Sequence, residues 1–280
     1  MTKEGRKSKK VLKYLVLIVA AIILIGGWFY RANIKDWWWQ VRQPELPKAI
    51  PAKEDKEDKE DKDQEKSEIF KEISENSDSI SSLSSEPQPI EIPSEINLAV
   101  PFTSQAPFSK WDSFDEEMCE EASLLMINRF YQNRGFASKD DQENALREIQ
   151  KWEEVNLPDW KSNNAQEIAR VAREMLGYKS AKVIPLTDFK QIKEQIAQNN
   201  PVILPAAGRE LKNPNFKAPG PLYHMLVVRG WLSDGRIITN DPGTRRGEGY
   251  IYDKSVLWDA IHDWNGGNVA SGQKVMIVVK

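Results

Sequence analysis

The sequence predicts an α+β fold with an antiparallel sheet, formed by residues 96–280. Segments with the helical spacing of apolar residues come first, between residues 118 and 198, and short apolar segments separated by turn residues follow. Helices that precede a run of strands are typical of the α+β class, whereas regular alternation of the two would indicate a parallel sheet. These residues, about 185 in number, are enough to bury a single core.

Four helices are expected, over residues 118–131, 141–154, 164–176 and 187–198. The first carries apolar side chains at helical spacing, namely Ala122, Leu125, Met126 and Phe130. The third is expected to begin at an Asn163 or Asn164 cap and to end at Gly177. Thr187 is the expected cap of the fourth.

Strands are expected in the second half, after Pro201. The expected segments are the apolar run 202–204 and residues 224–231, 236–240, 250–252 and 274–279. Gly235 turns the chain between the second and third of these. Residues 253–264 have helical spacing and interrupt the strands.

Charge divides the chain into three parts. Residues 1–44 carry a net charge of +7, residues 45–95 a net charge of −9, and residues 96–280 a net charge of −1. A nucleic-acid-binding domain needs a basic face, so the nearly neutral domain argues against a nucleic-acid partner.

The N-terminal part has the pattern of a signal-anchor. A basic head, residues 1–13, precedes the uncharged and mostly apolar run 14–30, which is expected to be a transmembrane helix in contact with membrane lipid. The positive-inside rule places the N-terminus in the cytoplasm and the domain outside the cell. A cleaved signal peptide is the alternative, but the run ends in Trp28, Phe29 and Tyr30 rather than in small residues.

Residues 31–95 are expected to be a juxtamembrane segment and a low-complexity spacer. The triplet Lys-Glu-Asp repeats over 53–61, and a Ser-rich stretch and several prolines follow. Such a composition buries too little apolar surface to offset the chain entropy. A charged single helix over 53–75 is the alternative, and it would also act as a spacer.

Cys119 is the single cysteine of the chain, which excludes an internal disulfide and a multi-cysteine zinc site. It is either an inert core thiol or a thiolate at a helix N-terminus, where the helix dipole lowers the thiol pKa. A lone thiol on an extracellular domain favours a functional role. Glu120 and Glu121 oppose it, because like charge disfavours a thiolate. Ser113 to Glu116 also resembles a capping box, which would start the helix before the cysteine.

His224 is the stronger candidate base of the two histidines, because it begins a strand after a Pro/Gly-rich stretch. His262 is expected to be a surface group near the end of a helix. Asp241 ends the next strand, and the hairpin between the two strands would bring it near His224. Gln105 lies fourteen residues before the cysteine and could donate an amide N–H to an oxyanion.

Together these residues occur in the order Gln, Cys, His, Asp. The domain resembles the bacterial papain-like cysteine peptidases of family thirty-nine, relatives of the double-glycine leader peptidases found on bacteriocin exporters. The resemblance rests on four segments, which are residues 100–105, 118–126, 223–231 and 238–243. Exporter-linked members often carry Gly and then a small residue or Pro after the cysteine, where this chain has Glu120 and Glu121.

The resemblance implies a papain-like fold and a triad of Cys119, His224 and Asp241. Gln105 and the Cys119 backbone N–H would form the oxyanion hole. The implied function is that of a membrane-anchored extracellular cysteine peptidase acting on a peptide or protein substrate, and no metal or cofactor is implied. Two alternatives stay open. One is a peptidoglycan amidase or endopeptidase with the same triad, and the other is a catalytically silent domain that binds peptides or cell-wall material.

Overall fold

The computed structural model describes Val16, Trp39, residues 41–53 and residues 90–280. The predicted head, most of the predicted anchor and spacer residues 54–89 lie outside the described residues. The chain divides into two compact units, Met1–Glu45 and Leu46–Lys280. Among the helices that the structure describes, none has the length and apolar character needed to cross a membrane.

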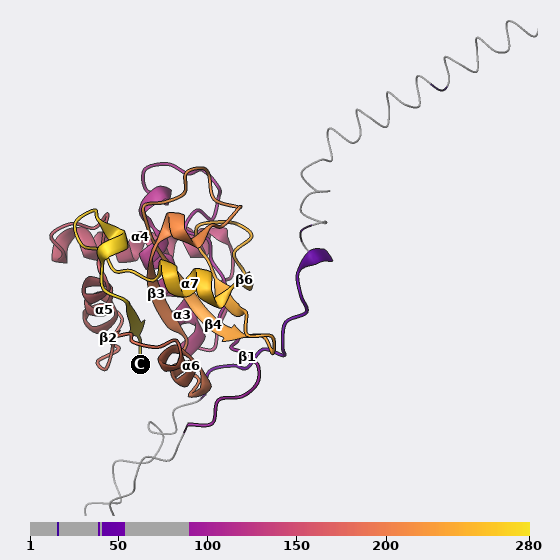
Figure 1. The fold of residues 1–280 in the computed structure, drawn as a ribbon. Coiled ribbons are helices and arrows are strands. Elements are labelled where there is room, and N and C mark those ends of the chain that lie inside the picture. The colour runs from indigo at the N-terminus through magenta and orange to yellow at the C-terminus, as the bar shows by residue number, and fades with distance from the viewer. Residues whose placement is uncertain (1–15, 17–38, 40, 54–89) are drawn as a thin grey trace, which may run out of the picture. The chain divides into compact units, whose positions relative to one another are not determined.

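The second unit is built on one antiparallel sheet, which confirms the predicted class (Figure 1). Its strand order is β2-β7-β3-β4-β5-β6, and β1 pairs with the end of β4. The strands are β1 (Ile96–Asn97), β2 (Lys182–Pro185), β3 (Val202–Ala207), β4 (Tyr223–Trp231), β5 (Ile237–Asn240), β6 (Tyr250–Tyr252) and β7 (Val275–Val278). Strand β2 is not among the strands that the sequence pattern predicts.

Strand β4 lies in the middle of the sheet and is buried along its whole length. It pairs with β3 on one side, where His224 faces Ala206, and with β5 on the other, where Val227 faces Asn240. The start of β4 and the end of β5 therefore lie at the same end of the sheet. At the other end, β1 approaches so closely at Gly230 that a Cβ there would overlap the Ile96 carbonyl.

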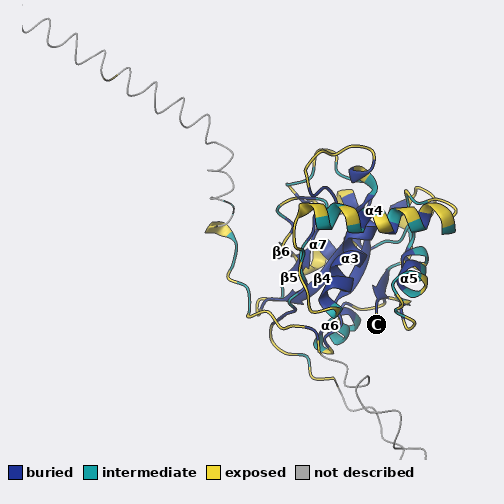
Figure 2. Ribbon diagram, turned by 180° about the vertical axis from the view of Figure 1, so that it is seen from behind, coloured by how far each residue is buried: buried dark blue, intermediate teal, exposed yellow. Residues whose placement is uncertain are grey.

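Five helices accompany the sheet: α3 (Cys119–Tyr131), α4 (Lys139–Asn156), α5 (Ala165–Glu174), α6 (Lys190–Ala197) and α7 (Lys254–Ala260). Three short 3-10 helices are η1 (Asp115–Glu117), η2 (Gly208–Leu211) and η3 (Val269–Ser271). Helix α3 packs against β3, β4, α4 and α5. Its residues from Cys119 to Phe130 are all buried. Figure 2 shows α3 in dark blue, whereas α4 presents exposed residues on its outward side.

The predicted start of the first helix at residue 118 agrees with α3 to within one residue, whereas the alternative Ser113 capping box and the predicted Thr187 cap were wrong. Asp112, and not Ser113, caps the turn before the cysteine, since its carboxylate accepts from the backbone N–H groups of Phe114 and Asp115. This turn is the single 3-10 turn η1, so α3 begins at Cys119 itself. Thr187 does not cap α6, which begins at Lys190. The cap expected at Asn164 is confirmed and forms a capping box with Glu167.

Residues 46–53, which we call the strap, lie along the domain although they fall within the predicted spacer. Ile50 pairs with Leu98, donates to the Asn97 carbonyl and accepts from Ala99. Ala52 is buried. The Asn199 side chain donates to the Pro51 carbonyl and accepts from the Lys53 N–H. The hydrogen bonds of the strap are made by its backbone groups, and such bonds leave little trace in composition.

Residues close to β1 also belong to the folded part. The Trp231 indole N–H donates to the carbonyls of Pro93 and Ser94, at 3.2 and 3.1 Å. Two described parts of the predicted spacer, 46–53 and 90–95, thus contact the domain on either side of the undescribed residues 54–89.

Replacing Asn199 with Gly tests the strap. Asn199 has φ of 70°, which Gly adopts without strain, so Asn199→Gly removes the two side-chain hydrogen bonds to the strap without straining the backbone. We expect the free energy of unfolding to fall by about 1–2 kcal/mol and Tm to fall by roughly 2–8 °C in a calorimetric scan. In a chain that begins at Ile90 and lacks the strap, the same substitution should cost less than half as much. Equal losses in both chains would show that the strap is not held by Asn199.

Candidate active site

His224 and Asp241 form a buried hydrogen-bonded pair at one end of the sheet. His224 lies near the start of β4, and Asp241 follows the last residue of β5. The His224 Nε2 is 2.8 Å from the Asp241 Oδ1, and the side chains are only 1% and 0% exposed. The hairpin thus brings together two of the residues selected from the sequence.

Asp241 is held as a carboxylate by donors on both of its oxygens. The Gly243 N–H donates to Oδ1 at 3.0 Å. The Tyr252 hydroxyl donates to Oδ2 at 2.6 Å, and the Asn213 Nδ2 donates to the same oxygen at 3.0 Å. Burial alone would raise the pKa of Asp241, but the His224 charge and these hydrogen bonds keep it below its usual value. The group is therefore ionised at neutral pH.

The imidazole ring of His224 is enclosed by two further residues. Phe216 meets it edge to face, with the ring centroids 5.3 Å apart. A Cβ on Gly243 would lie 2.9 Å from the His224 Cε1, so the glycine leaves the ring its space. These contacts restrict the movement of the ring on two sides.

Cys119 is the first residue of α3, and its thiol lies against the neighbouring strand β4. The backbone N–H of Met225, the residue after His224, faces the sulfur and favours its ionised form. The thiol donates a hydrogen bond to the Glu120 carboxylate, with 2.9 Å between Sγ and Oε2. The cysteine therefore contacts the strand that carries the candidate base.

The electrostatics around Cys119 differ from what a helix N-terminus alone would give. Burial, followed by the Glu120 charge, raises the pKa of the Cys119 thiol well above its usual value. Burial and Glu121 likewise raise the pKa of Glu120. The like-charge effect of the two glutamates opposes the dipole of α3, and the thiol is protonated in this arrangement.

Gln105 joins the two halves of the site. Its backbone N–H donates to the Pro242 carbonyl at 3.0 Å, next to Asp241. Its Nε2 donates to the carbonyls of Asp115 and Glu116, at 2.8 and 3.2 Å, in the turn before Cys119. Both amide hydrogens are thus directed at the backbone here, and the oxyanion role of Gln105 stays a prediction.

Beneath Cys119, Glu121 of α3 faces Glu153 of α4. Both side chains are fully buried, and their oxygens meet no donor from another described residue. Two carboxylates cannot hydrogen-bond to each other, but a protonated one can donate to its partner. Burial and mutual repulsion raise the pKa of Glu121, and burial raises the pKa of Glu153 to about 8. The pair therefore retains a proton at neutral pH.

His262 lies apart from these residues, after the end of α7. Its Nδ1 is 2.7 Å from the Gly272 carbonyl, and its backbone N–H donates to the Pro205 carbonyl. The ring is half-buried and holds the loop before β7, so it has a structural contact rather than the expected free surface position.

Sequence reasoning missed Asn213, Phe216 and Tyr252, which surround the His224–Asp241 pair. Asn213 and Phe216 come from the segment between η2 and β4, and Tyr252 ends β6. No spacing connects them with the triad residues in the sequence. Tyr250, Ile251 and Tyr252 were expected to form a strand. The burial of Tyr252 at its end is what brings this residue to the site, and only that predicted strand pointed to it.

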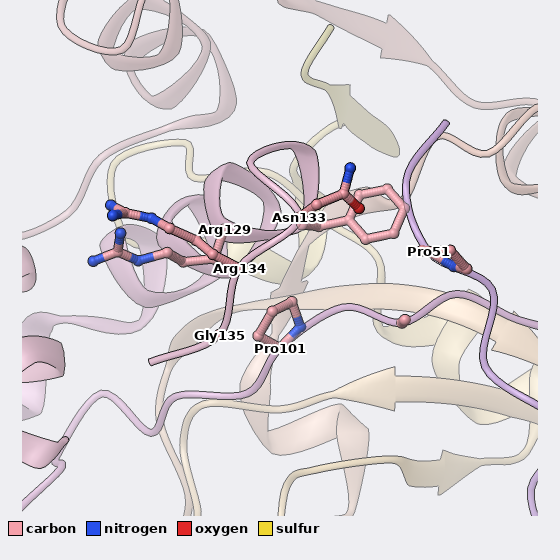
Figure 3. Close-up of a pocket in the computed structure, with 8 residues that line it drawn as sticks. Pro51, Pro101, Arg129, Asn133, Arg134 and Gly135 are labelled. Carbon is pink, nitrogen blue, oxygen red and sulfur yellow. The ribbon is translucent and has the colours of Figure 1, made fainter. Parts of the chain in front are cut away.

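A pocket at the other end of α3 contains none of these candidates (Figure 3). It is lined by Pro51 of the strap and by Ala99, Pro101, Arg129, Phe130, Asn133, Arg134 and Gly135. Helix α3 has 13 residues, which corresponds to a length of about 20 Å between this pocket and Cys119. Within the described residues, no group of three or more His, Cys, Asp or Glu side chains is arranged to hold a metal ion.

A comparison with known protein families identifies the family of this domain. The family model of the Peptidase_C39 like family matches residues 97–265, more than half of the chain. The chain belongs to this family. The domain is accordingly a papain-like cysteine peptidase domain, as predicted, and the matched range includes Gln105, Cys119, His224 and Asp241.

Two solved structures have a weak likeness to this family member. One is a candidate C39-like peptidase from Bacillus anthracis, with 15% identity and a TM-score of 0.42, covering 66% of this chain and 98% of that one. The other is a fragment of prointerpain A from Prevotella intermedia, with 15% identity and a TM-score of 0.30, covering 41% of this chain and 33% of that one. No curated protein sequence matches the chain. The family assignment therefore rests on the family model.

Replacing Glu120 with Gln should make the thiol more acidic. The substitution removes the carboxyl group that accepts the thiol hydrogen bond and, when ionised, repels the thiolate, but it keeps the shape of the side chain. We expect alkylation of Cys119 by iodoacetamide at pH 7.5 to become roughly three- to tenfold faster, because more thiolate is present. Glu116→Gln removes an exposed charge three residues before the cysteine and is the matched control. An alkylation rate in Glu120→Gln equal to that of the control would contradict the role assigned to Glu120.

The Glu121–Glu153 pair should make the domain less stable as the pH rises. In the unfolded chain both groups lose their protons near pH 4.5, whereas Glu153 in the folded domain keeps its proton up to about pH 8. Between these values the unfolded state binds fewer protons, so stability falls with increasing pH. We expect Tm to decline from pH 5 to pH 8, and Glu153→Gln to make this decline smaller, because it removes one of the two buried carboxyls and its repulsion of Glu121.

At pH 8 the Tm of the Glu153→Gln variant should be roughly 2–4 °C above that of the unmodified protein. This difference corresponds to about 1 kcal/mol in the free energy of unfolding. Glu154→Gln changes an exposed neighbour on α4 and should leave the pH dependence unaltered. A parallel decline in Tm for the protein and for Glu153→Gln would exclude the buried pair as its cause.

Proposed function

We propose that the domain is an active cysteine peptidase in which Cys119, His224 and Asp241 form the catalytic triad. The observation that carries this proposal is the buried 2.8 Å contact between His224 and Asp241. His224 lies on β4, and the backbone N–H of the next residue, Met225, faces the Cys119 thiol. The family supports a peptide or protein as substrate. Family membership alone does not decide activity, which depends on the state of the thiol.

The contacts of His224 suit the role of a general base. Asp241 accepts from Nε2, so this nitrogen carries the proton in the neutral ring and Nδ1 is the basic nitrogen. In the proposed mechanism Nδ1 takes the thiol proton, and Asp241 stabilises the resulting imidazolium. The thiolate attacks the peptide carbonyl, and the imidazolium then protonates the leaving amine. Water hydrolyses the thioester that remains on Cys119.

The oxyanion formed in the attack needs donors close to Cys119. The backbone N–H of Cys119 at the first position of α3 is one proposed donor, because the first turn of a helix leaves its N–H groups without partners inside the helix. The Gln105 amide is the second. It serves in this way when one of its hydrogens turns from the Asp115 or Glu116 carbonyl toward the substrate.

The Cys119–Glu120 contact favours a second candidate, a domain that binds peptides without cleaving them. In the arrangement described, the thiol proton faces Glu120 and not His224. Catalysis requires the S–H to turn from the carboxylate to the imidazole. A domain in which the thiol keeps its present partner would be catalytically silent, and it would be indistinguishable in fold from the active one.

Substitution of the triad distinguishes the two candidates. Cys119→Ala should reduce peptide hydrolysis to background, and His224→Ala should lose a similar amount, because the two groups act as a unit. Asp241→Asn should lose roughly two to four orders of magnitude, and Gln105→Ala about a hundredfold in kcat with little change in KM. His262→Ala is the control and should retain kcat within about twofold. The measurement is hydrolysis of a peptide library followed by mass spectrometry.

A silent domain would give no cleavage with the unmodified protein and no difference among these variants. Release of peptidoglycan fragments without cleavage of any library peptide would instead indicate a cell-wall amidase. Either outcome would replace the peptidase proposal.

We also propose that the domain is anchored in the membrane by residues 14–30 and lies outside the cell. The support is the basic head, the uncharged apolar run and the aromatic residues that follow it in the sequence. Lipid around this helix and a peptide substrate near the membrane would then be the partners of the protein.

Protease added to intact cells tests this topology. We expect it to remove the domain and leave residues 1–13 protected, as detected with tags at the two ends of the chain. A C-terminal tag that is protected until the cells are lysed would reverse the topology. A mature protein that begins after Tyr30 and is recovered from the medium would show that the apolar run is a cleaved signal peptide.

A further inference from the structure

Asp241 is bound on its far side by two buried residues that do not belong to the proposed triad. The Tyr252 hydroxyl donates to the Asp241 Oδ2 at 2.6 Å, and the Asn213 Nδ2 donates to the same oxygen at 3.0 Å. The Asn213 Nδ2 is also 2.9 Å from the Tyr252 hydroxyl. The three side chains thus form a closed triangle of contacts, and each of them is at most 6% exposed.

This triangle leaves the Asp241 carboxylate no rotational freedom. Its Oδ1 is held by His224 and by the Gly243 N–H, while Oδ2 is held by Tyr252 and Asn213. Rotation about the carboxylate bond would break contacts on both oxygens at once, and Asp241, His224, Tyr252 and Asn213 are all buried. The position of Oδ1, and with it the plane of the imidazole, therefore depends on the donors to Oδ2.

We infer that Tyr252 and Asn213 are positioning residues, which orient the Asp241 carboxylate so that His224 presents Nδ1 to the Cys119 thiol. The inference rests on the proposed peptidase function and adds to it. Neither residue contacts the thiol in the described structure, and both act on the reaction through Asp241. Their loss should consequently lower kcat and leave KM nearly unchanged.

The chemistry of each side chain fits this role. Burial and the Asp241 charge raise the pKa of Tyr252 well above its usual value, so the hydroxyl keeps its proton at neutral pH and donates to Asp241. The Asn213 side chain is held in turn, because its Oδ1 accepts from the backbone N–H of Asn215. The Asn213 donor is thus held in place by a contact that does not involve Asp241.

Tyr252→Phe is the primary test, because it removes the hydroxyl and keeps the buried ring. A hydrogen bond to a charged group accounts for roughly 10- to 100-fold when expressed as a rate, so we expect kcat to fall by that factor. The matched control is Tyr178→Phe, which removes a phenol hydroxyl that donates to Asn128 at 2.9 Å. Asn213→Ala is the second variant and should show the same split between kcat and KM.

Nitrogen-15 NMR gives a readout that needs no turnover. The chain has only two histidines, so the His224 signals can be assigned with the His262→Ala variant. We expect the hydrogen-bonded Nε2–H signal of His224 to be sharp in the unmodified protein and in Tyr178→Phe. In Tyr252→Phe this proton should exchange faster with water, and the share of the Nδ1–H tautomer should rise.

A kcat in Tyr252→Phe within twofold of the unmodified protein, together with unchanged His224 signals, would overturn the inference. A loss of kcat with unchanged signals would overturn it too, because the effect would then not pass through the imidazole. If the unmodified protein cleaves no peptide, the proposed function fails. The His224 signals of the two tyrosine variants still decide the positioning role in that case.

Discussion

The complete burial of α3 is the constraint on which the candidate site depends. The sheet covers one side of this helix and α4 and α5 cover others, so Cys119, Glu120 and Glu121 are withdrawn from water together. A helix with no solvent-facing side cannot direct its acidic residues outward. The same packing that holds the thiol against β4 therefore holds two carboxyl groups beside it, and their protons become part of the site.

The two halves of the site handle buried negative charge in opposite ways. Around Asp241 four hydrogen-bond donors stabilise an ionised carboxylate. Around Glu121 and Glu153 no donor from another described residue is present, and the carboxyls keep protons instead. Gln105 connects the halves, since it bonds to the residue after Asp241 and to the turn before Cys119. Gln105 is thus one direct connection between the β5–β6 loop and the turn before the thiol.

The sequence was informative wherever a pattern is local. Helix α5 with its Asn164 cap, strand β4 and the Gly235 turn all follow from spacing and turn chemistry, and the family resemblance singled out the four candidate residues. Contacts made over long distances were not accessible in this way. The strap is held largely by backbone groups, β2 carries no clear alternation, and Tyr252 meets Asp241 only because β6 pairs with β5. The two glutamates after the cysteine were noted as unfavourable, but their depth required the packing of α3.

Because of the strap, the length of the Lys-Glu-Asp segment does not set the distance between the domain and the residues that precede it. The chain contacts the domain at Lys53 through Asn199 and again at Pro93 through Trp231, so both ends of the segment between these residues are attached to one folded body. Doubling such a loop costs only about 0.6 kcal/mol. Triplets can be gained or lost there without moving the domain away from whatever precedes Leu46. If residues 14–30 span the membrane as proposed, the linker between the membrane helix and the domain is the segment 31–45 alone. Fully extended, this linker reaches at most roughly 50 Å.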